Sequence, residues 1–492
     1  MRRVVVSVAR FALVITLAFL TMAGSVNAKE VVLNFAINLE LRSPDPIQKT
    51  GNTDYVLAYN LYEPLVYPTP EKGKLVQPWI AESWTMSADG KVYTFKIRPG
   101  ILFHDGSEIT ADDVVFSMDR MLALKGASAT YFSPILDVGQ TKAVDKYTVR
   151  FHLKKASPSF LASLLQLQVI NEDLLMANKQ PGPHGKYGDY GVKYLETHDA
   201  GSGPYILKKV KYAEVIELEK FPEYWRGWKK NQVDRVVMRI IPEDVTRAAM
   251  LRTGELDMVD WSLSKLIFDQ LEKAPGVVVR RDPNLAVWLL TMNNKKPPLD
   301  DVYVRRALSY AFQYEDVVNI VGGSQAEGPV PNLLGGHASS GVQVYQQNLA
   351  KAKEMLGKSK YSAQELAKSE IVINTIASSE RFRRIALSAI SAFSKIGINA
   401  RIENVTWPQL CELCTKPDTA PHMAVFYQAA DIPHPYYFLV YYTPDGWGSS
   451  YPPGGVYYDN RRAADLIQKA STVTDQAEQM KLYGEAQREI SK

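Results

Sequence analysis

The side chains that carry out catalysis are present in this chain, but they do not occur in the patterns that catalytic motifs require. The sequence has no G-x-S-x-G nucleophile motif, no H-E-x-x-H zinc motif, no Walker loop and no G-x-G-x-x-G dinucleotide motif. Its aspartates and glutamates are numerous, yet no spacing singles out a catalytic pair. From these residues alone, no catalytic set can be proposed.

Histidine and cysteine give no predicted metal site and no predicted cofactor. The seven histidines lack the spacing of a ligand set. The two cysteines, Cys411 and Cys414, form a C-x-x-C pair on a short expected helix. We interpret the pair as structural rather than redox-active, and a local disulfide between them stays open. The scattered histidines are His104, His152, His184, His198, His337, His422 and His434.

Asp431 is the one carboxylate whose position does single it out. It follows a strand expected at 423–427, and Pro433 and Pro435 interrupt the loop in which it lies. In α/β proteins the end of a strand is where ligand-binding groups are placed. A buried carboxylate that faces a buried cation would orient a ligand. The alternative is that Asp431 only caps its loop.

A β-hairpin is the strongest local pattern in the chain. Asp89-Gly90 predicts its turn, because that turn needs positive φ angles. Tyr93, Phe95 and Ile97 alternate with more polar residues, which predicts one apolar face. Pro99-Gly100 ends the second strand.

The whole stretch 81–106, AESWTMSADGKVYTFKIRPGILFHDG, resembles the signature region of the family 5 periplasmic solute-binding proteins. Further strings, YNLYEPLV, ITADDVVFSMDR and PLDDVYVRRALSYAF, are similar to other segments of that family. The resemblance covers nearly all of the chain from Glu30 onward. It implies an α/β periplasmic-binding-protein-like fold: two lobes joined by a hinge, plus an extra α/β domain.

The resemblance also implies where a ligand would bind. The loop at Asp431 is similar to the ADY..P motif of the family, whose matching Asp binds the α-ammonium group of a peptide in the peptide-binding members. Trp407 lies in NVTWPQL, where the family often presents a pocket residue. Tyr427 precedes Asp431 on the expected strand, Trp447 lies in a glycine-rich loop beyond it, and Arg42 lies in the loop after the first strand. A core or surface role is the alternative for Trp407, Trp447 and Arg42.

Periodicity in the rest of the chain predicts alternating strands and helices, which fits an α/β protein. The expected strands cover 31–36, 147–153, 215–220, 236–241, 256–259, 287–293, 371–376, 400–405 and 423–427, and the expected helices cover 54–63, 243–253, 350–356 and 381–396, with two more that begin at 110 and just after 297.

We expect the domains to follow the family pattern. The first lobe would consist of residues 29–76 and 205–285, the inserted extra domain of 77–204, and the second lobe of 286–492. Because family members usually continue further, we expect the second lobe to be truncated at its C-terminus.

Residues 1–28 read as a cleavable signal peptide, with three arginines, an apolar segment from Phe11 to Met22 and Val26-Asn27-Ala28 before the cut. The leader accounts for three of the four formal positive charges, which leaves +1 for the mature chain. A charge so close to zero argues against nucleic acid or an acidic membrane as partner.

We therefore expect a periplasmic, monomeric substrate-binding component of an ABC importer. Its partners would be a peptide or peptide-like solute and the permease of the inner membrane. Two alternatives remain: the same fold could bind a metal chelate, haem, opine or sugar, or the chain could be an exported hydrolase or redox enzyme.

Overall fold

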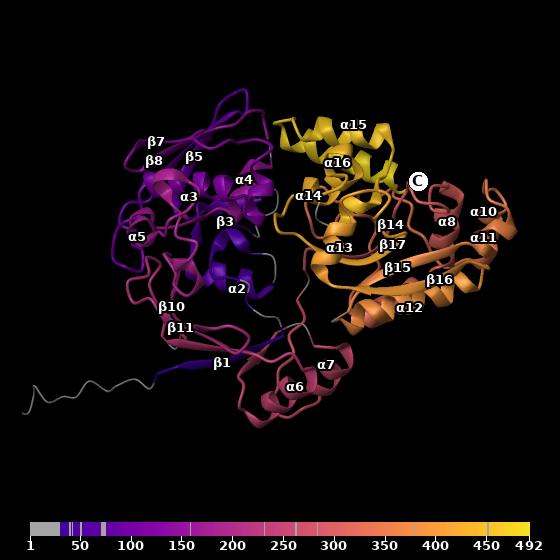
Figure 1. Cartoon of the computed structure of the whole chain (residues 1–492), viewed down its shortest axis with the longest axis horizontal. Helices are drawn as coiled ribbons and strands as arrows, with labels where there is room; N and C mark the ends of the chain where they lie inside the picture. The colour runs from indigo at the N-terminus through magenta and orange to yellow at the C-terminus, as the bar shows by residue number, and fades with distance from the viewer. Residues whose placement is uncertain are drawn as a thin grey trace, which may run out of the picture.

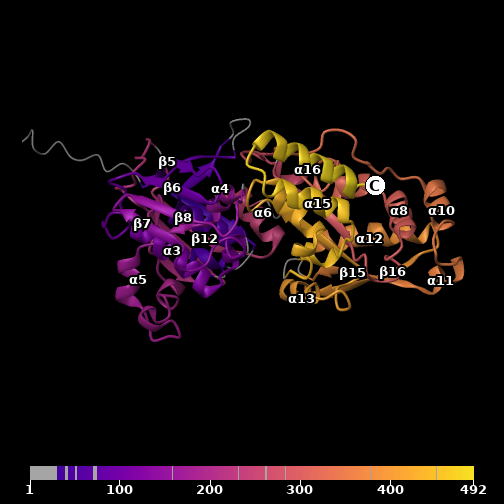
Figure 2. The same cartoon turned by 90° about the horizontal axis from the view of Figure 1, so that it is seen from above.

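Two bodies lie side by side in the structure, one formed by the N-terminal part of the chain and the other by the C-terminal part (Figure 1). Figure 2 shows the same two bodies from above, with α6 near their junction. We call them the first and second lobes. The predicted leader and Arg42 lie outside the described residues. The computed structural model describes residues 30–38, 41, 43–49, 52–69, 75–157, 159–230, 232–260, 263–282, 284–377, 379–449 and 452–492.

The predicted hairpin is confirmed and forms half of a four-stranded antiparallel sheet with the order β5-β6-β8-β7. Gly90 in its turn has a φ of 67°, which favours glycine. Tyr93, Phe95 and Ile97 are buried, as their alternation predicts. These strands are β5 (Ala81–Met86), β6 (Val92–Ile97), β7 (Thr141–Asp145) and β8 (Thr148–His152).

A five-stranded mixed sheet, ordered β10-β11-β12-β1-β13, forms the lower part of the first lobe in Figure 1. Its core also includes Ile170, Leu175 and Leu195, which follow the hairpin sheet in sequence. The domain boundaries expected at residues 77 and 204 stay a prediction. The strands are β1 (Val32–Ile37), β10 (Tyr205–Lys211), β11 (Val215–Lys220), β12 (Arg235–Ile240) and β13 (Met258–Val259).

The second lobe contains a four-stranded sheet, β14-β17-β15-β16, in which β17 pairs antiparallel with β14 and parallel with β15. Helix α12 runs along one face of this sheet, and its buried residues share a core with β15 and β17 (Figure 1). The strands are β14 (Ala286–Met292), β15 (Glu370–Ile376), β16 (Asn399–Val405) and β17 (Met423–Ala429).

Helices and short strands connect these sheets, and every strand and helix predicted above overlaps an observed element. The first-lobe helices are α2 (Asn52–Leu61), α3 (Ala111–Leu124), α4 (Phe160–Ser163), α5 (Glu172–Asn178), α6 (Asp244–Thr253) and α7 (Lys265–Leu271). The second-lobe helices are α8 (Val302–Ala311), α9 (Tyr314–Val321), α10 (Leu349–Leu356), α11 (Ala363–Lys368), α12 (Glu380–Ser394), α13 (Trp407–Leu413), α14 (Pro435–Leu439), α15 (Arg461–Ala470) and α16 (Gln476–Ile490).

Short 3₁₀ helices of three to five residues and strands of two or three residues complete the fold. The 3₁₀ helices are η1 (Pro46–Gln48), η2 (Ala127–Tyr131), η3 (Leu164–Gln166), η4 (Gly185–Tyr187), η5 (Tyr194–Glu196), η6 (Val440–Tyr442), η7 (Pro444–Gly446) and η8 (Pro452–Val456). The short strands pair as β2 (Glu63–Pro64) with β9 (Gln168–Val169), and β3 (Val66–Pro68) with β4 (Val76–Pro78). Within the described ranges, no helix combines the length and apolar character needed to cross a bilayer.

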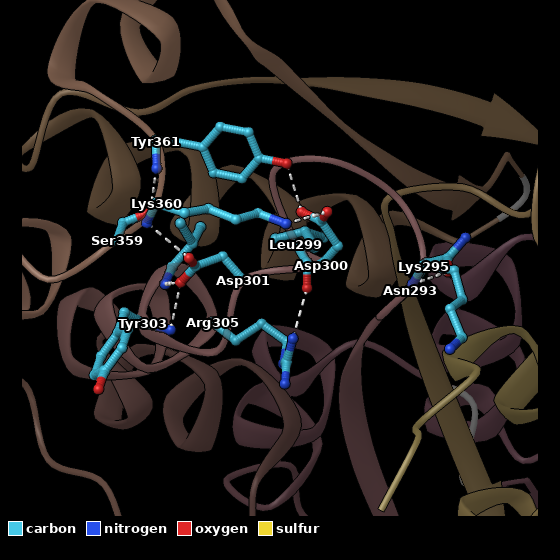
Figure 3. Close-up of polar contacts among 11 residues, drawn as sticks. Asn293, Lys295, Leu299, Asp300, Asp301, Tyr303, Arg305, Ser359, Lys360 and Tyr361 are labelled. Atoms are coloured by element: carbon cyan, nitrogen blue, oxygen red, sulfur yellow. Dashed lines mark hydrogen bonds and ion pairs between the residues drawn. The ribbon is translucent and has the colours of Figure 1, made fainter.

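The string PLDDVYVRRALSYAF serves to build the scaffold (Figure 3). Asp301 caps α8 by accepting the backbone N–H groups of Tyr303 and Val304 at 2.7 and 3.1 Å. Its second oxygen accepts the backbone N–H of Lys360 at 2.9 Å. The neighbouring Asp300 holds the side chain of the same lysine at 2.7 Å. The two carboxylates therefore tie the start of α8 to the segment before α11.

We expect Asp301→Ala to destabilise the protein more than Asp300→Ala. Losing a helix cap costs about 0.5–2 kcal/mol, and the N–H of Lys360 would also lose its partner. The Asp300 ion pair is partly exposed, and such pairs contribute about 0–1 kcal/mol. Urea unfolding followed by circular dichroism measures the free energy of unfolding of each variant. An equal loss of stability in the two variants would contradict this account of α8.

Candidate ligand-binding site

Asp431 lies just beyond the end of β17, where the second lobe faces the first. Strand β17 is held on both sides by β14 and β15, and the N–H of Ala430 donates to the carbonyl of Leu285 at 2.8 Å. The chain then turns, and His434 caps α14 by accepting the N–H of Tyr436 at 3.2 Å. This turn brings α14 back beside Asp431.

Hydroxyl groups from both lobes donate to the carboxylate of Asp431. The hydroxyl of Tyr131 in η2 lies 2.7 Å from Oδ2, and that of Tyr437 in α14 lies 3.2 Å from the same atom. Tyr131 belongs to the first lobe and Tyr437 to the second, so the carboxylate bridges the lobes. The amide of Gln166 in η3 donates to the backbone carbonyl of Asp431 at 2.5 Å.

An apolar cluster surrounds these polar contacts. It is built mainly from α14, α15 and α16, but it includes Ala162 of the first-lobe helix α4, and Tyr131 packs against it. Figure 1 shows α4 and α14 at the facing edges of the two lobes. Asp431 itself is half-buried at this junction.

Lys49, in the first lobe, is a buried cation close enough to interact with this carboxylate. Its ammonium group donates to four oxygens, those of Pro46, Ser128, Gln166 and Gln168. Burial lowers the pKa of Lys49 to about 7, while attraction from Asp431 and Asp45 works in the opposite direction.

Burial also raises the pKa of Asp431. Hydrogen bonds from Tyr131, Tyr437 and Tyr55, together with the charge of Lys49, counteract that rise. The hydrogen bonds and the charge of Lys49 favour the ionised carboxylate, which can accept a cation because an opposite charge replaces the water that burial removes. The arrangement suits recognition of a charged group, and it has no nucleophile paired with a base.

Tyr427 lies on β17 among other aromatic side chains. Its ring is 4.9 Å from that of Trp288, the residue that lies opposite it on the neighbouring strand β14. The ring of Trp288 also lies 5.0 Å from that of Phe382. The guanidinium of Arg381 lies 5.8 Å from the Trp288 ring and donates to the carbonyl of Leu263 in the first lobe at 2.9 Å. This cluster is therefore a second place where the lobes touch.

Trp407 and Trp447 lie outside the aromatic cluster at Tyr427. Trp407 stacks on Phe426, with ring centroids 5.8 Å apart. Because Phe426 and Tyr427 are adjacent on a strand, they point to opposite faces, so Trp407 and Tyr427 do not face one site. The ring of Trp447 lies 5.8 Å from the ammonium of Lys295, and its buried indole N–H has no acceptor among the described residues.

Cys411 and Cys414 both carry free thiols, and burial raises their pKa values to about 11 and about 12. A thiol with a high pKa is a poor nucleophile. In the part of the chain that the structure describes, no three His, Cys, Asp or Glu side chains gather closely enough to hold a metal ion.

Sequence reasoning placed Asp431 at the end of a strand but missed its partners. Tyr131 and Gln166 are 300 and 265 residues away from it in sequence. No motif or periodicity marks these two residues or Lys49. Only the three-dimensional fold brings them together.

Comparison with known proteins identifies the family. Residues 76–450 match the family described as "Bacterial extracellular solute-binding proteins, family 5 Middle". The chain belongs to the family 5 bacterial extracellular solute-binding proteins, and the resemblance inferred from the sequence is confirmed.

Two relatives and one solved structure illustrate the likeness. The probable D,D-dipeptide-binding periplasmic protein DdpA of Escherichia coli is 29% identical over 454 residues, which cover 90% of this chain and 83% of that protein. Heme-binding protein A of Haemophilus influenzae is 27% identical over 443 residues, covering 84% and 76%. The periplasmic binding protein DppA from Helicobacter pylori, in complex with the peptide STSA, superposes with a TM-score of 0.78 at 29% identity, covering 94% and 90%. The expected periplasmic-binding-protein-like α/β fold is confirmed.

The lowered pKa of Lys49 predicts how stability depends on pH. An unfolded lysine has a pKa of 10.5, so between pH 7 and 10 the unfolded chain binds more protons than the folded one. The free energy of unfolding should therefore rise with pH, by at most about 1.4 kcal/mol per pH unit from this group. Lys49→Met should lack that rise. Urea unfolding at pH 7.5, 8.25 and 9 tests it, and parallel curves for the two proteins would contradict the prediction.

Proposed function

We propose that this chain is the substrate-binding component of an ABC importer and binds a peptide or peptide-like solute where its two lobes meet. The observation that carries the proposal is the carboxylate of Asp431, which is half-buried at the lobe junction and accepts hydroxyl hydrogen bonds from both sides. The D,D-dipeptide-binding relative and the peptide complex of the H. pylori protein support peptide as the solute class.

Asp431 would bind the α-ammonium group of the solute. An ammonium group has three donors, and the carboxylate, with about four acceptor sites, has room beyond the hydrogen bonds from Tyr131, Tyr437 and Tyr55. Because the carboxylate is already largely desolvated, a cation that reaches it gains a strong, oriented contact. Tyr427 and the loop residue Arg42 are proposed as further ligand contacts. Trp407 and Trp447 were predicted as contacts too, but they do not share a site with Tyr427, so a role for them in binding the same group is less favoured.

Ligand binding would favour the arrangement in which the lobes touch, and the permease would recognise that form. A ligand shifts such an equilibrium only by its differential affinity for the two states. A ligand held by groups from both lobes has that property. The chain would act as a monomer in the periplasm, with an inserted domain at 77–204 between the two parts of the first lobe, 29–76 and 205–285, and a second lobe from 286 onward.

Members of the family need not bind peptides, and one experiment distinguishes the possible solutes. A relative is a heme-binding protein, so haem, a metal chelate, an opine or a sugar would fit the family without an ammonium group at Asp431. Native mass spectrometry of protein purified from the periplasm identifies a trapped solute by its mass. A peptide mass supports the proposal, whereas a porphyrin or chelate mass contradicts it. Turnover of a peptide would favour the hydrolase alternative.

We expect Asp431→Asn to weaken binding of the probe peptide Ala-Ala-Ala by roughly two to three powers of ten. Removing one partner of a buried charge pair costs about 3–5 kcal/mol, and about 1.4 kcal/mol is tenfold in affinity. Isothermal titration calorimetry with Ala-Ala-Ala and with its N-acetylated form measures the effect. The acetylated peptide should bind weakly to both proteins.

Asp418→Asn is the matched control, because Asp418 is an exposed carboxylate shortly before β17. It should bind Ala-Ala-Ala like the wild type. Equal affinity of Asp431→Asn and wild type for Ala-Ala-Ala would refute the role of Asp431, as would a loss of binding caused by unfolding in circular dichroism.

The predicted leader gives a separate test of location. If residues 1–28 are a signal peptide, the exported protein should begin at Lys29 and appear in the osmotic-shock fraction. N-terminal sequencing of that fraction decides the matter. Retention of Met1, or recovery only in the membrane pellet, would show that the leader is not cleaved.

A further inference from the structure

We infer that Lys49 is a positioning residue: it holds in place Tyr131 and Gln166, two first-lobe side chains that hydrogen-bond to Asp431. The inference rests on the proposed function, since it assigns to Lys49 the task of organising the site around Asp431. Lys49 itself acts through these two residues and need not touch the solute.

The ammonium of Lys49 joins the two short segments that present these side chains. It donates to the hydroxyl of Ser128 in η2 at 3.2 Å, and η2 ends with Tyr131. It donates to the carbonyl of Gln166 in η3 at 3.0 Å and to the side chain of Gln168, just after η3, at 2.6 Å. One buried group thus fixes both segments at the lobe junction.

Short 3₁₀ segments need such a support. A 3₁₀ segment of three or five residues has few backbone hydrogen bonds of its own and poor hydrogen-bond geometry, so its position depends on external contacts. Segments η2 and η3 are far from Lys49 in sequence, at separations of 79 and 117 residues. An ammonium group can donate in three directions at once, which an apolar side chain of the same length cannot do.

Lys49 is in turn anchored to the body of the first lobe. It follows η1, whose carbonyl at Pro46 also accepts from the ammonium at 3.1 Å. Asp45 caps η1 and forms a buried two-bond ion pair with Arg120 of α3, at 3.0 and 2.6 Å. Arg120 also donates to the carbonyl of Tyr190 at 2.9 Å. The support for Tyr131 and Gln166 therefore continues into a rigid helix.

Hydrogen-exchange mass spectrometry on the full-length, ligand-free protein tests the inference at pH 6, where Lys49 is protonated. We expect Lys49→Met to raise exchange at least tenfold in three segments, 127–132, 164–168 and 430–437. Exchange in the hairpin strands β5 and β6 should stay unchanged, because local opening need not spread through the whole lobe. A merely structural role would loosen the hairpin sheet too and would leave the second-lobe segment 430–437 as it is.

A combined variant shows whether Lys49 acts through the two side chains. Tyr131→Phe with Gln166→Met should raise exchange in 430–437 as Lys49→Met does, and adding Lys49→Met to that pair should raise it no further. Residues that act through one another are not additive, whereas independent ones are. A further increase in the triple variant would overturn the inference.

Two milder variants decide the matter if Lys49→Met does not fold. Ser128→Ala should loosen 127–132 alone, and Gln168→Met should loosen 164–168 alone. No change in either would overturn the inference. The measurement uses no solute, so failure of Ala-Ala-Ala to bind would refute the proposed function and leave this result standing. A wild-type exchange pattern in Lys49→Met would refute the inference and leave the function standing.

Discussion

The hydrogen bond between the hydroxyl of Tyr131 and the carboxylate of Asp431, at 2.7 Å, is the contact on which the rest of the site depends. A partly buried carboxylate needs hydrogen-bond donors, and in the second lobe Tyr437 donates to this side chain. The first lobe supplies the shorter of these two bonds. Any group that binds Asp431 must therefore either share the carboxylate with Tyr131 or displace it, so solute binding and the contact between the lobes are linked.

Some contacts in the surrounding structure stabilise each lobe internally, and others lie at the junction between the lobes. Strand β17 carries Asp431 from the centre of the second sheet, and the carboxylates of Asp300 and Asp301 secure α8 in the same lobe. Asp300 and Asp301 belong to a string by which the family is recognised, and their contacts serve the scaffold. The junction instead uses side chains on short 3₁₀ segments and loops, where a change of residue alters recognition without disturbing a sheet.

Local features of this fold could be predicted from the sequence because their causes are local. The Asp89-Gly90 turn and the apolar face of its hairpin follow from backbone sterics and from two-residue alternation. The place of Asp431 at a strand end could be predicted for the same reason. Its partners could not, since contacts over 265 and 300 residues leave no periodic pattern. Trp407 and Tyr427 belong to neighbouring strings, yet they lie on opposite faces of β17, which only the packing of α13 on Phe426 reveals.

A crystal structure of the protein grown with Ala-Ala-Ala tests the central claim most directly, because it locates the solute relative to Asp431. The account predicts peptide density at the lobe junction, with the α-ammonium within about 3.2 Å of a carboxylate oxygen of Asp431. It also predicts that residues of both lobes contact the peptide. Peptide density away from Asp431, or a peptide whose carboxylate end faces Asp431, would contradict the account.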